Sequence, residues 1–224
     1  MMDFQFHVAA DNFGLLLHGL LLTVELTLIV MALSLVFGLI IALAGRSRFA
    51  PVRWIVKAYI ELIRGTPLLL QLIYIYFVLP EFGITLNSFV AAVIALTLNY
   101  SAFISEVYRG AIQAVARGQY DAAAALGMTP GLSMRRIVVP QAVRMVIPSL
   151  GNYFISLFKD TALCSVISMQ EILFKAQMSA AQNFQYFTLY SMVALMYFAV
   201  SFPAARFVEH IDRISRRAFT RRTH

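Results

Sequence analysis

The chain has few charged residues for its length. Asp, Glu, Lys and Arg make up 13% of its 224 residues, whereas 60% of the residues are hydrophobic. A soluble globular domain carries about 25% charged residues. The composition therefore excludes an ordinary soluble domain and predicts a protein that faces lipid.

Several motifs of catalytic and ligand-binding proteins are missing from the sequence. It contains no Gly-x-x-x-x-Gly-Lys-Ser/Thr segment, so we expect no ATP-binding loop in this chain. Its one cysteine, Cys164, lies in an apolar run and cannot form an internal disulfide. The histidines lie near the two ends, at His7, His18, His210 and His224. With no Cys/His cluster and no nucleophile–base arrangement, we predict neither a metal site, nor a cofactor, nor an enzyme.

Long apolar runs take up most of the sequence. Five of them approach or exceed the 20 or so residues that cross a bilayer, and they cover residues 15–44, 54–79, 88–108, 145–169 and 187–208. The second and fourth runs are interrupted. The pattern predicts an all-α integral membrane protein with five transmembrane helices.

Lys and Arg are distributed unevenly between the loops. Residues 1–14 contain none, unlike the positive start of a cleavable signal peptide, so we expect this segment to be retained. Five lie in 45–66, five in 106–144 and six from Arg206 onward, against only Lys159 and Lys175 elsewhere. Because the side rich in Lys and Arg is cytoplasmic, we expect the N-terminus outside and the C-terminus inside. The net charge of +7 then reflects membrane topology, and we expect membrane lipid, not nucleic acid, as a partner.

Both interrupted runs predict helices that bend or break. Gly65-Thr66-Pro67 leaves only residues 68–79 for the second half of the second span, or about 18 Å of helix. Pro148 and Gly151 are expected to weaken the fourth span in the same way.

Polar residues inside the spans indicate a solute path or structural pairs. Asn99 and Glu106 are seven residues apart and share a helix face. We expect Asn99 to line a path and Glu106 to pair with Arg109 or with a neighbouring helix. Lys159 and Asp160 could neutralise each other, or they could bind the carboxylate and ammonium of a zwitterion. We prefer the second interpretation, in which the two residues line the solute path.

Residues 119–140 form a polar segment between apolar runs. Four alanines after Asp121 predict a short helix, which Gly127 ends as a left-handed cap. Thr129 then caps a second helix that has Pro130 in its first turn, and Pro140 closes the segment.

This segment resembles the coupling loop of bacterial ABC import permeases, which reads Glu-Ala-Ala, then Gly, then Ile-x-x-Pro. Other stretches are similar to permeases for polar amino acids, namely Arg64-Gly65-Thr66-Pro67-Leu68, Leu98-Asn99-Tyr100-Ser101-Ala102, Gly151-Asn152 and Phe154-Ile155-Ser156-Leu157-Phe158-Lys159-Asp160-Thr161. The resemblance covers nearly the whole chain. It implies a type I ABC importer permease fold, as a single domain over residues 1–224, in a bacterial inner membrane.

The resemblance also implies partners and site residues. The partners are cytoplasmic ATPase subunits that hold ATP-Mg, a second permease subunit (identical or paralogous), an extracytoplasmic solute-binding protein and a small amino acid. The expected substrate path comprises Asn99, Lys159, Asp160, Thr161, Tyr153 and Asn152. The expected ATPase-coupling segment spans about 117–140 and includes Tyr120, Asp121, Ala122, Ala123, Gly127 and Pro140. Two positions depart from the family: Asp121 replaces the usual Glu, and Tyr153 stands where Glu or another polar residue is frequent.

Three other functions remain open at this point. The solute could be another small zwitterion, such as an opine or an ectoine-like compound. The chain could be a secondary transporter or channel with Lys159, Asp160 and Glu106 as an ion relay, although no internal repeat is visible. It could also be a passive membrane anchor, for which broken spans with buried polar groups would serve no purpose.

Overall fold

The computed structural model describes residues 4–220, and within that range every regular element is helical. The long helices are α1 (Phe6–Ala44), α4 (Ser88–Gln113), α7 (Val139–Asp160) and α9 (Tyr186–Thr220). The shorter ones are α2 (Ala50–Gly65), α3 (Leu68–Ile73), α5 (Arg117–Ala125), α6 (Pro130–Ser133) and α8 (Ile172–Asn183). Four irregular turns extend them: π-helical η1 (Tyr74–Val78) and η3 (Met134–Val138), and the 3-10 turns η2 (Leu79–Phe82) and η4 (Thr161–Ile167).

The second predicted span is bent, as the sequence indicates. Helix α2 ends at Gly65, and the chain turns by 105° before residues 68–82 continue as α3, η1 and η2. Thr66 is extended (φ −119°, ψ 143°), because the ring of Pro67 disfavours a helical conformation in the residue before it. Its hydroxyl donates a hydrogen bond to the carbonyl of Leu62 and so satisfies a group at the end of α2.

The fourth predicted span differs from the expectation, and the prediction that it weakens at Pro148 and Gly151 is wrong. Helix α7 runs through both residues and ends at Asp160. A Cβ on Gly151 would lie 2.5 Å from a side-chain carbon of Val208, so this glycine permits close packing of α7 against α9. The break comes later, at η4, and α8 follows it as a helix that the apolar pattern does not indicate.

Among the described residues, three helices are long and apolar enough to cross a membrane alone: α1, α4 and residues 186–214 of α9. The bent pair formed by α2 and residues 68–82 adds a fourth span if it is counted as one. Helix α7 is not among these candidates, and the five-span count stays a prediction.

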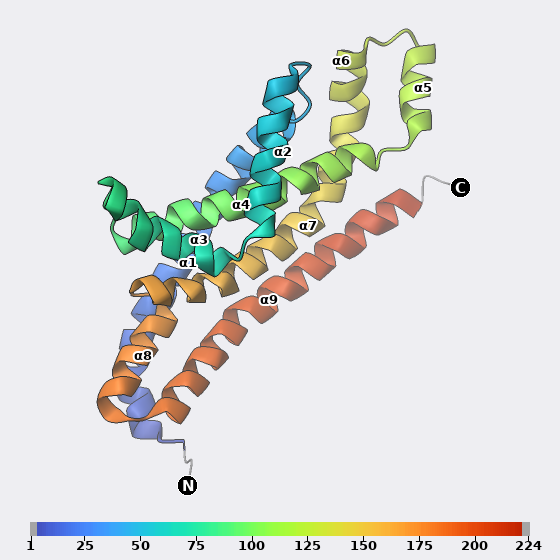
Figure 1. Ribbon diagram of the computed structural model, residues 1–224. Helices are drawn as coiled ribbons and strands as arrows, with labels where there is room; N and C mark the ends of the chain where they lie inside the picture. Colours follow the sequence, from blue (N-terminus) through green and yellow to red (C-terminus); the bar gives the residue numbers. More distant parts are fainter. Residues whose placement is uncertain (1–3, 221–224) are drawn as a thin grey trace.

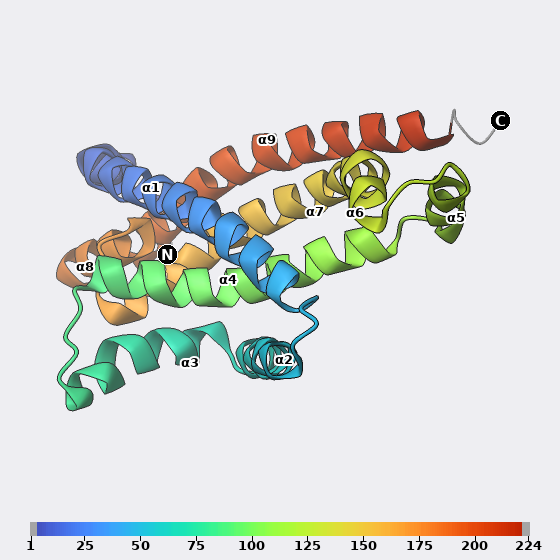
Figure 2. The same cartoon turned by 90° about the horizontal axis from the view of Figure 1, so that it is seen from above.

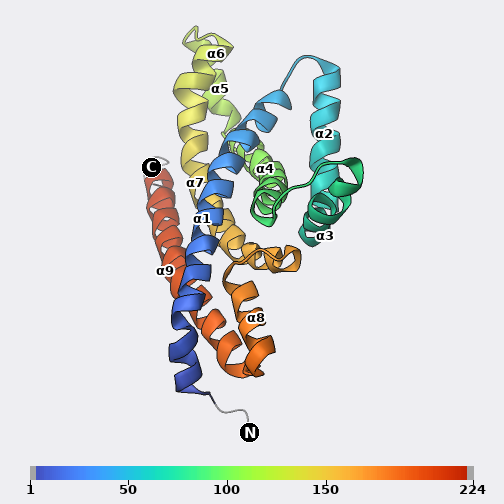
Figure 3. The same cartoon turned by 90° about the vertical axis from the view of Figure 1, so that its left-hand side faces the viewer.

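The helices form an elongated bundle whose two ends differ (Figure 1). The N-terminal end of α1 lies at one end, and the C-terminal end of α9 lies toward the other, where α5 and α6 project. Figure 2 shows α3 running alongside α4, with α2 nearly perpendicular to both. In Figure 3, α1 passes between α9 and the pair of α4 and α3.

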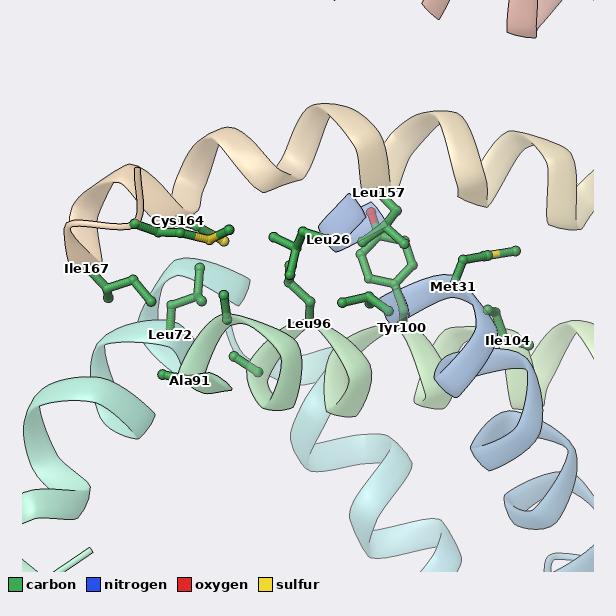
Figure 4. Packing of buried hydrophobic residues seen from close by; sticks show 14 residues of the cluster. Leu26, Met31, Leu72, Ala91, Leu96, Tyr100, Ile104, Leu157, Cys164 and Ile167 are labelled. Carbon is green, nitrogen blue, oxygen red and sulfur yellow. The ribbon is translucent and has the colours of Figure 1, made fainter. Parts of the chain in front are cut away.

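The main apolar core lies where α1, α3, α4 and η4 meet, and its central members are seen in Figure 4. A second cluster joins the start of α1 to α8 and α9, and a third joins the end of α4 to η3 and α7.

Candidate functional site

A cavity of about 320 Å³ opens between the bend of the second span, α4 and α7. We call it the inner cavity. It is lined by Thr66, Leu68, Asn99, Tyr100, Phe103, Tyr153, Ser156 and Asp160. Three predicted path residues therefore meet in one cavity: Asn99 comes from α4, and Tyr153 and Asp160 come from α7.

Asp160 is held in the inner cavity by a tyrosine that the sequence analysis did not single out. The hydroxyl of Tyr100 donates a hydrogen bond of 2.6 Å to Oδ2 of Asp160. Tyr100 is 3% exposed, so packing fixes the direction of this hydroxyl. The second carboxylate oxygen of Asp160 can accept hydrogen bonds from a ligand.

Asn99 is oriented by a second group that sequence reasoning missed. Its amide nitrogen donates to Oε1 of Gln71 at 3.0 Å, and Gln71 donates in turn to the Thr66 hydroxyl at 2.9 Å. The chain of amide and hydroxyl groups connects α4 to the bend after α2. A glutamine inside the apolar run 68–79 was the sequence signal for this contact.

The other predicted path residues lie outside the inner cavity. Lys159 and Asn152 are exposed. Thr161 is fully buried and donates to the carbonyl of Phe158 at 2.7 Å. Over residues 4–214, whose side chains the structure describes, no ion pair joins Lys159 to Asp160. The two side chains are consecutive on α7 and therefore point in different directions.

Glu106 makes the structural contact expected of it. It accepts hydrogen bonds from the Nε and Nη2 atoms of Arg109, one turn along α4. Arg64 from the end of α2 approaches the same carboxylate at 3.7 Å and lies over the ring of Phe103, 5.3 Å from its centroid. This cluster fixes α2 against α4 next to the inner cavity.

The predicted coupling segment folds as its sequence indicates. Helix α5 is followed by Gly127 at φ +72°, in the left-handed conformation expected of a glycine cap. Thr129 caps α6 by accepting a hydrogen bond from the amide of Leu132 at 3.4 Å, with Pro130 in the first turn. The helical path then continues through Pro140, which lies in the first turn of α7 and does not end the segment.

Within this segment the predicted coupling residues have different surroundings. Asp121, Ala122, Gly127 and Pro140 are exposed, at the end of the bundle where α5 and α6 project (Figure 1). Ala123 is fully buried, and the Tyr120 hydroxyl donates to the carbonyl of Ile112 at 3.3 Å, which ties α5 to the end of α4.

A second, more open cavity of about 470 Å³ lies farther along α4, toward its N-terminal end. We call it the outer cavity, after the expected topology. It is lined by Leu22, Glu25, Ser88, Phe89, Ser168, Met169 and Gln170. The described part of the chain contains no group of three His, Cys, Asp or Glu side chains that could hold a metal ion.

With this geometry established, comparison with known proteins identifies the family. Residues 34–217 match the family model described as the binding-protein-dependent transport system inner membrane component. The chain belongs to this family. It is accordingly a transport subunit of an inner membrane.

Individual relatives agree with the family match over most of their length. The L-cystine transport system permease protein of Bacillus subtilis is 41% identical over 86% of this chain and 82% of its own. The arginine transport system permease protein of the same organism is 34% identical over 89% of this chain and 91% of its own.

Solved structures show the same fold. A crystal structure of an amino acid ABC transporter with histidines is 36% identical, with a TM-score of 0.91 over 94% of this chain and 99% of that one. An inward-facing MetNI methionine ABC transporter, 19% identical, matches with a TM-score of 0.69 over 90% of this chain and 98% of its own, and supports the fold alone. The predicted type I ABC permease fold and the resemblance to amino-acid permeases are confirmed.

Proposed function

We propose that this chain is the permease subunit of an ABC importer for polar amino acids and that the inner cavity holds the solute. The observation that carries the proposal is the meeting of Asp160, Asn99 and Tyr153 in one cavity beside two helix breaks. Helix breaks with polar groups inside a membrane domain are typical of transporter sites. The relatives named for cystine, arginine and other amino acids support the solute class.

The inner cavity has the chemistry to bind a zwitterion. The carboxylate of Asp160 pairs with the ammonium group, with Tyr100 holding its other oxygen. Ser156, Tyr153 and Asn99 line the same cavity, and their hydroxyl and amide groups can donate hydrogen bonds to the carboxylate of the solute. Asp160 is the one acidic residue among the side chains that line this cavity. A second positive charge on the solute would lack a partner, so we expect neutral zwitterions to be preferred over cationic amino acids.

The exposed coupling segment supports the proposed assembly. Asp121, Ala122 and Gly127 lie on the projecting α5–α6 end, where a cytoplasmic ATPase subunit holding ATP-Mg can dock. A second permease subunit and an extracytoplasmic binding protein complete the proposed importer. The orientation proposed for this assembly has the N-terminus outside and the C-terminus in the cytoplasm.

The ion-relay alternative gains no support from the contacts of its three residues. Glu106 is engaged with Arg109 and Arg64, Asp160 with Tyr100, and Lys159 is exposed. Across residues 4–214, no hydrogen bond or ion pair links any two of the three.

The proposal is tested by Asp160→Asn, which keeps the size of the side chain and removes its charge. A hydrogen bond to a charged group contributes about 1.5–3 kcal/mol, so we expect uptake at low solute concentration to fall by about tenfold to a hundredfold. Complex yield and basal ATPase activity should stay close to wild type. Asp11→Asn, at an exposed aspartate of α1, is the matched control. Uptake equal to that of the control, or a loss of complex in proportion to the loss of uptake, would contradict the proposed site.

A further inference from the structure

A fully buried carboxylate lies inside the bundle, away from the lining of both cavities. Glu171 comes directly before α8 and is 0% exposed. It lines neither the inner nor the outer cavity. Across residues 4–214 no ion pair neutralises it. Because burying a carboxylate is costly unless its oxygens are hydrogen-bonded, its hydrogen-bond donors indicate what this glutamate does.

One role of Glu171 is to cap α8. Its two carboxylate oxygens accept hydrogen bonds from the amides of Leu173 at 2.9 Å and Phe174 at 2.7 Å. The side chains preferred at this position of a helix are the shorter ones of Ser, Thr, Asp and Asn, so capping alone does not require a glutamate. The longer side chain also brings Oε2 to the hydroxyl of Tyr197 on α9, which donates to it at 3.2 Å. Glu171 therefore joins the start of α8 to α9.

Tyr197 in turn contacts the end of α7 on both sides of Asp160 in the sequence. Its ring lies edge-on against that of Phe158, with 5.3 Å between the centroids. Its hydroxyl lies close to that of Thr161, which donates to the carbonyl of Phe158 at 2.7 Å. Phe158 is 3% exposed and Thr161 is 0% exposed. The residues that flank Asp160 are therefore packed against one tyrosine.

Helix α1 contributes to the same cluster. Thr23 is fully buried, lies close to the hydroxyl of Tyr197, and accepts a hydrogen bond from the amide of Ile172 at 3.5 Å. Gly19, one turn earlier, allows this approach, because a Cβ there would lie 2.7 Å from the Cα of Ile172. Residues from α1, η4 and α9 thus meet around the start of α8. We call Thr23, Thr161, Glu171 and Tyr197 the polar cluster.

The polar cluster matters for the inner cavity because Asp160 is the last residue of α7. The last carbonyl groups of a helix have no partner within it, and helix ends fray unless other contacts hold them. Tyr100 on α4 holds the carboxylate of Asp160. Tyr197 on α9 holds the residues on either side of it. Asp160 is therefore fixed from two helices.

We propose that Tyr197, held in place by Glu171, is a positioning residue for the solute site and sets the direction of the Asp160 carboxylate. It acts through Phe158 and Thr161, since Tyr197 itself does not line the inner cavity. The inference rests on the proposed function, because it presumes that Asp160 pairs with the solute. It adds to that function two residues on elements that do not border the solute.

The test is a double-mutant cycle between Tyr197→Phe and Asp160→Asn. Tyr197→Phe removes the hydroxyl and keeps the ring against Phe158. Binding of radiolabelled L-glutamine, L-histidine and L-cystine to the purified permease–ATPase complex is measured. For the tightest of the three we expect Tyr197→Phe to weaken binding at least fivefold, but less than twofold when Asp160→Asn is already present, because residues that act through one contact are not additive. The same loss in both backgrounds would overturn the positioning role.

Two further variants separate positioning from stability. Tyr190→Phe removes a hydroxyl from an exposed tyrosine two turns away on α9 and should leave binding unchanged. Glu171→Asp keeps a preferred cap for α8 but is too short to reach Tyr197, so we expect it to weaken binding about as much as Tyr197→Phe does, with complex yield near wild type. Wild-type binding in Glu171→Asp would contradict the proposal, as would a loss of complex in proportion to the loss of binding in both Glu171→Asp and Tyr197→Phe.

The two proposals fail in different ways. If Asp160→Asn binds and transports the solute as wild type does, the assignment of the inner cavity is wrong, and the positioning role falls with it. If Asp160→Asn loses binding while Tyr197→Phe keeps it, the solute site stands and the positioning role is wrong.

Discussion

At the scale of single residues, the polar groups near the inner cavity occur in pairs that cross between elements. Tyr100 bonds to Asp160, and Asn99 bonds to Gln71. An unpaired polar group in an apolar interior costs several kcal/mol, about 2–7 depending on the reference state. Asp160 and Asn99 therefore need these partners, and the partners fix the geometry that a solute meets.

Gly127 carries a residue-scale prediction. A Cβ there would meet nothing within 4 Å, yet φ is +72°. Leucine in the left-handed region costs about 1–2 kcal/mol, so Gly127→Leu should distort the turn between α5 and α6. We expect ATP hydrolysis to continue with at least tenfold less transport for each ATP, or the ATPase to dissociate, with membrane insertion unchanged.

Two further variants separate backbone strain from bulk. Gly131 has equal space around it and no positive φ, so Gly131→Leu should keep coupling. Gly127→Asn should keep part of the coupling that Gly127→Leu loses, because asparagine tolerates the left-handed conformation better than leucine. Normal transport per ATP in Gly127→Leu would contradict the assigned role of this turn.

At the scale of elements, local chemistry predicts some breaks well and others poorly. Gly65-Thr66-Pro67 gives the bend after α2, because proline acts on its own neighbours in the chain. The turn from α5 to α6 is predicted by Gly127, Thr129 and Pro130, because these residues also act on their own neighbours in the chain. Pro148 and Gly151 do not break α7, because packing against α9 stabilises the helix. The end of α7 at Asp160, and the existence of α8, depend on tertiary contacts that periodicity does not encode.

The contact between α7 and α9 gives an element-scale prediction. Gly151→Ala would place a methyl group 2.5 Å from Cγ2 and 2.9 Å from Cγ1 of Val208. Such overpacking costs about 1–3 kcal/mol, so we expect a lower thermal unfolding temperature of the purified complex.

A matched pair of variants tests the cause. Adding Val208→Ala to Gly151→Ala removes both clashing carbons and should restore much of the lost stability. Gly19→Ala is the contrasting case, because its methyl group would meet the backbone of Ile172 at 2.7 Å, which no side-chain change relieves. If Val208→Ala gave no recovery, the packing explanation for Gly151 would be wrong.

At the scale of the whole molecule, the fold class follows from composition and from the length of the apolar runs, because apolar runs of about 20 residues indicate membrane-spanning helices. The family follows from a few motifs. The sequence predicts only part of the candidate site. Asn99 and Asp160 are predicted as polar residues in apolar runs, and Tyr153 as a departure from the family pattern. Tyr100 and Gln71 look like ordinary members of the apolar runs, and only the fold shows their partners. Lys159 was predicted with Asp160 because they are adjacent in sequence, although adjacent helical positions face different ways.

The expected topology is tested by labelling engineered cysteines in intact cells with a reagent that does not cross the membrane. Ile84→Cys, between η2 and α4, should react from outside, and Ala125→Cys, at the end of α5, should react only after the membrane is opened. Both positions are exposed, and the native Cys164 is buried and serves as the background control. Reaction of Ala125→Cys in intact cells would refute the five-span orientation.

The central claim is that this chain carries polar amino acids through the inner cavity. Its most direct measurement is the ATPase activity of the reconstituted importer, with its binding protein, across a panel of amino acids. We predict stimulation by one or more neutral polar amino acids, weaker stimulation by cationic ones, and loss of stimulation in Asp160→Asn with basal hydrolysis retained. Stimulation that is absent for every amino acid, or unchanged in Asp160→Asn, would contradict the account.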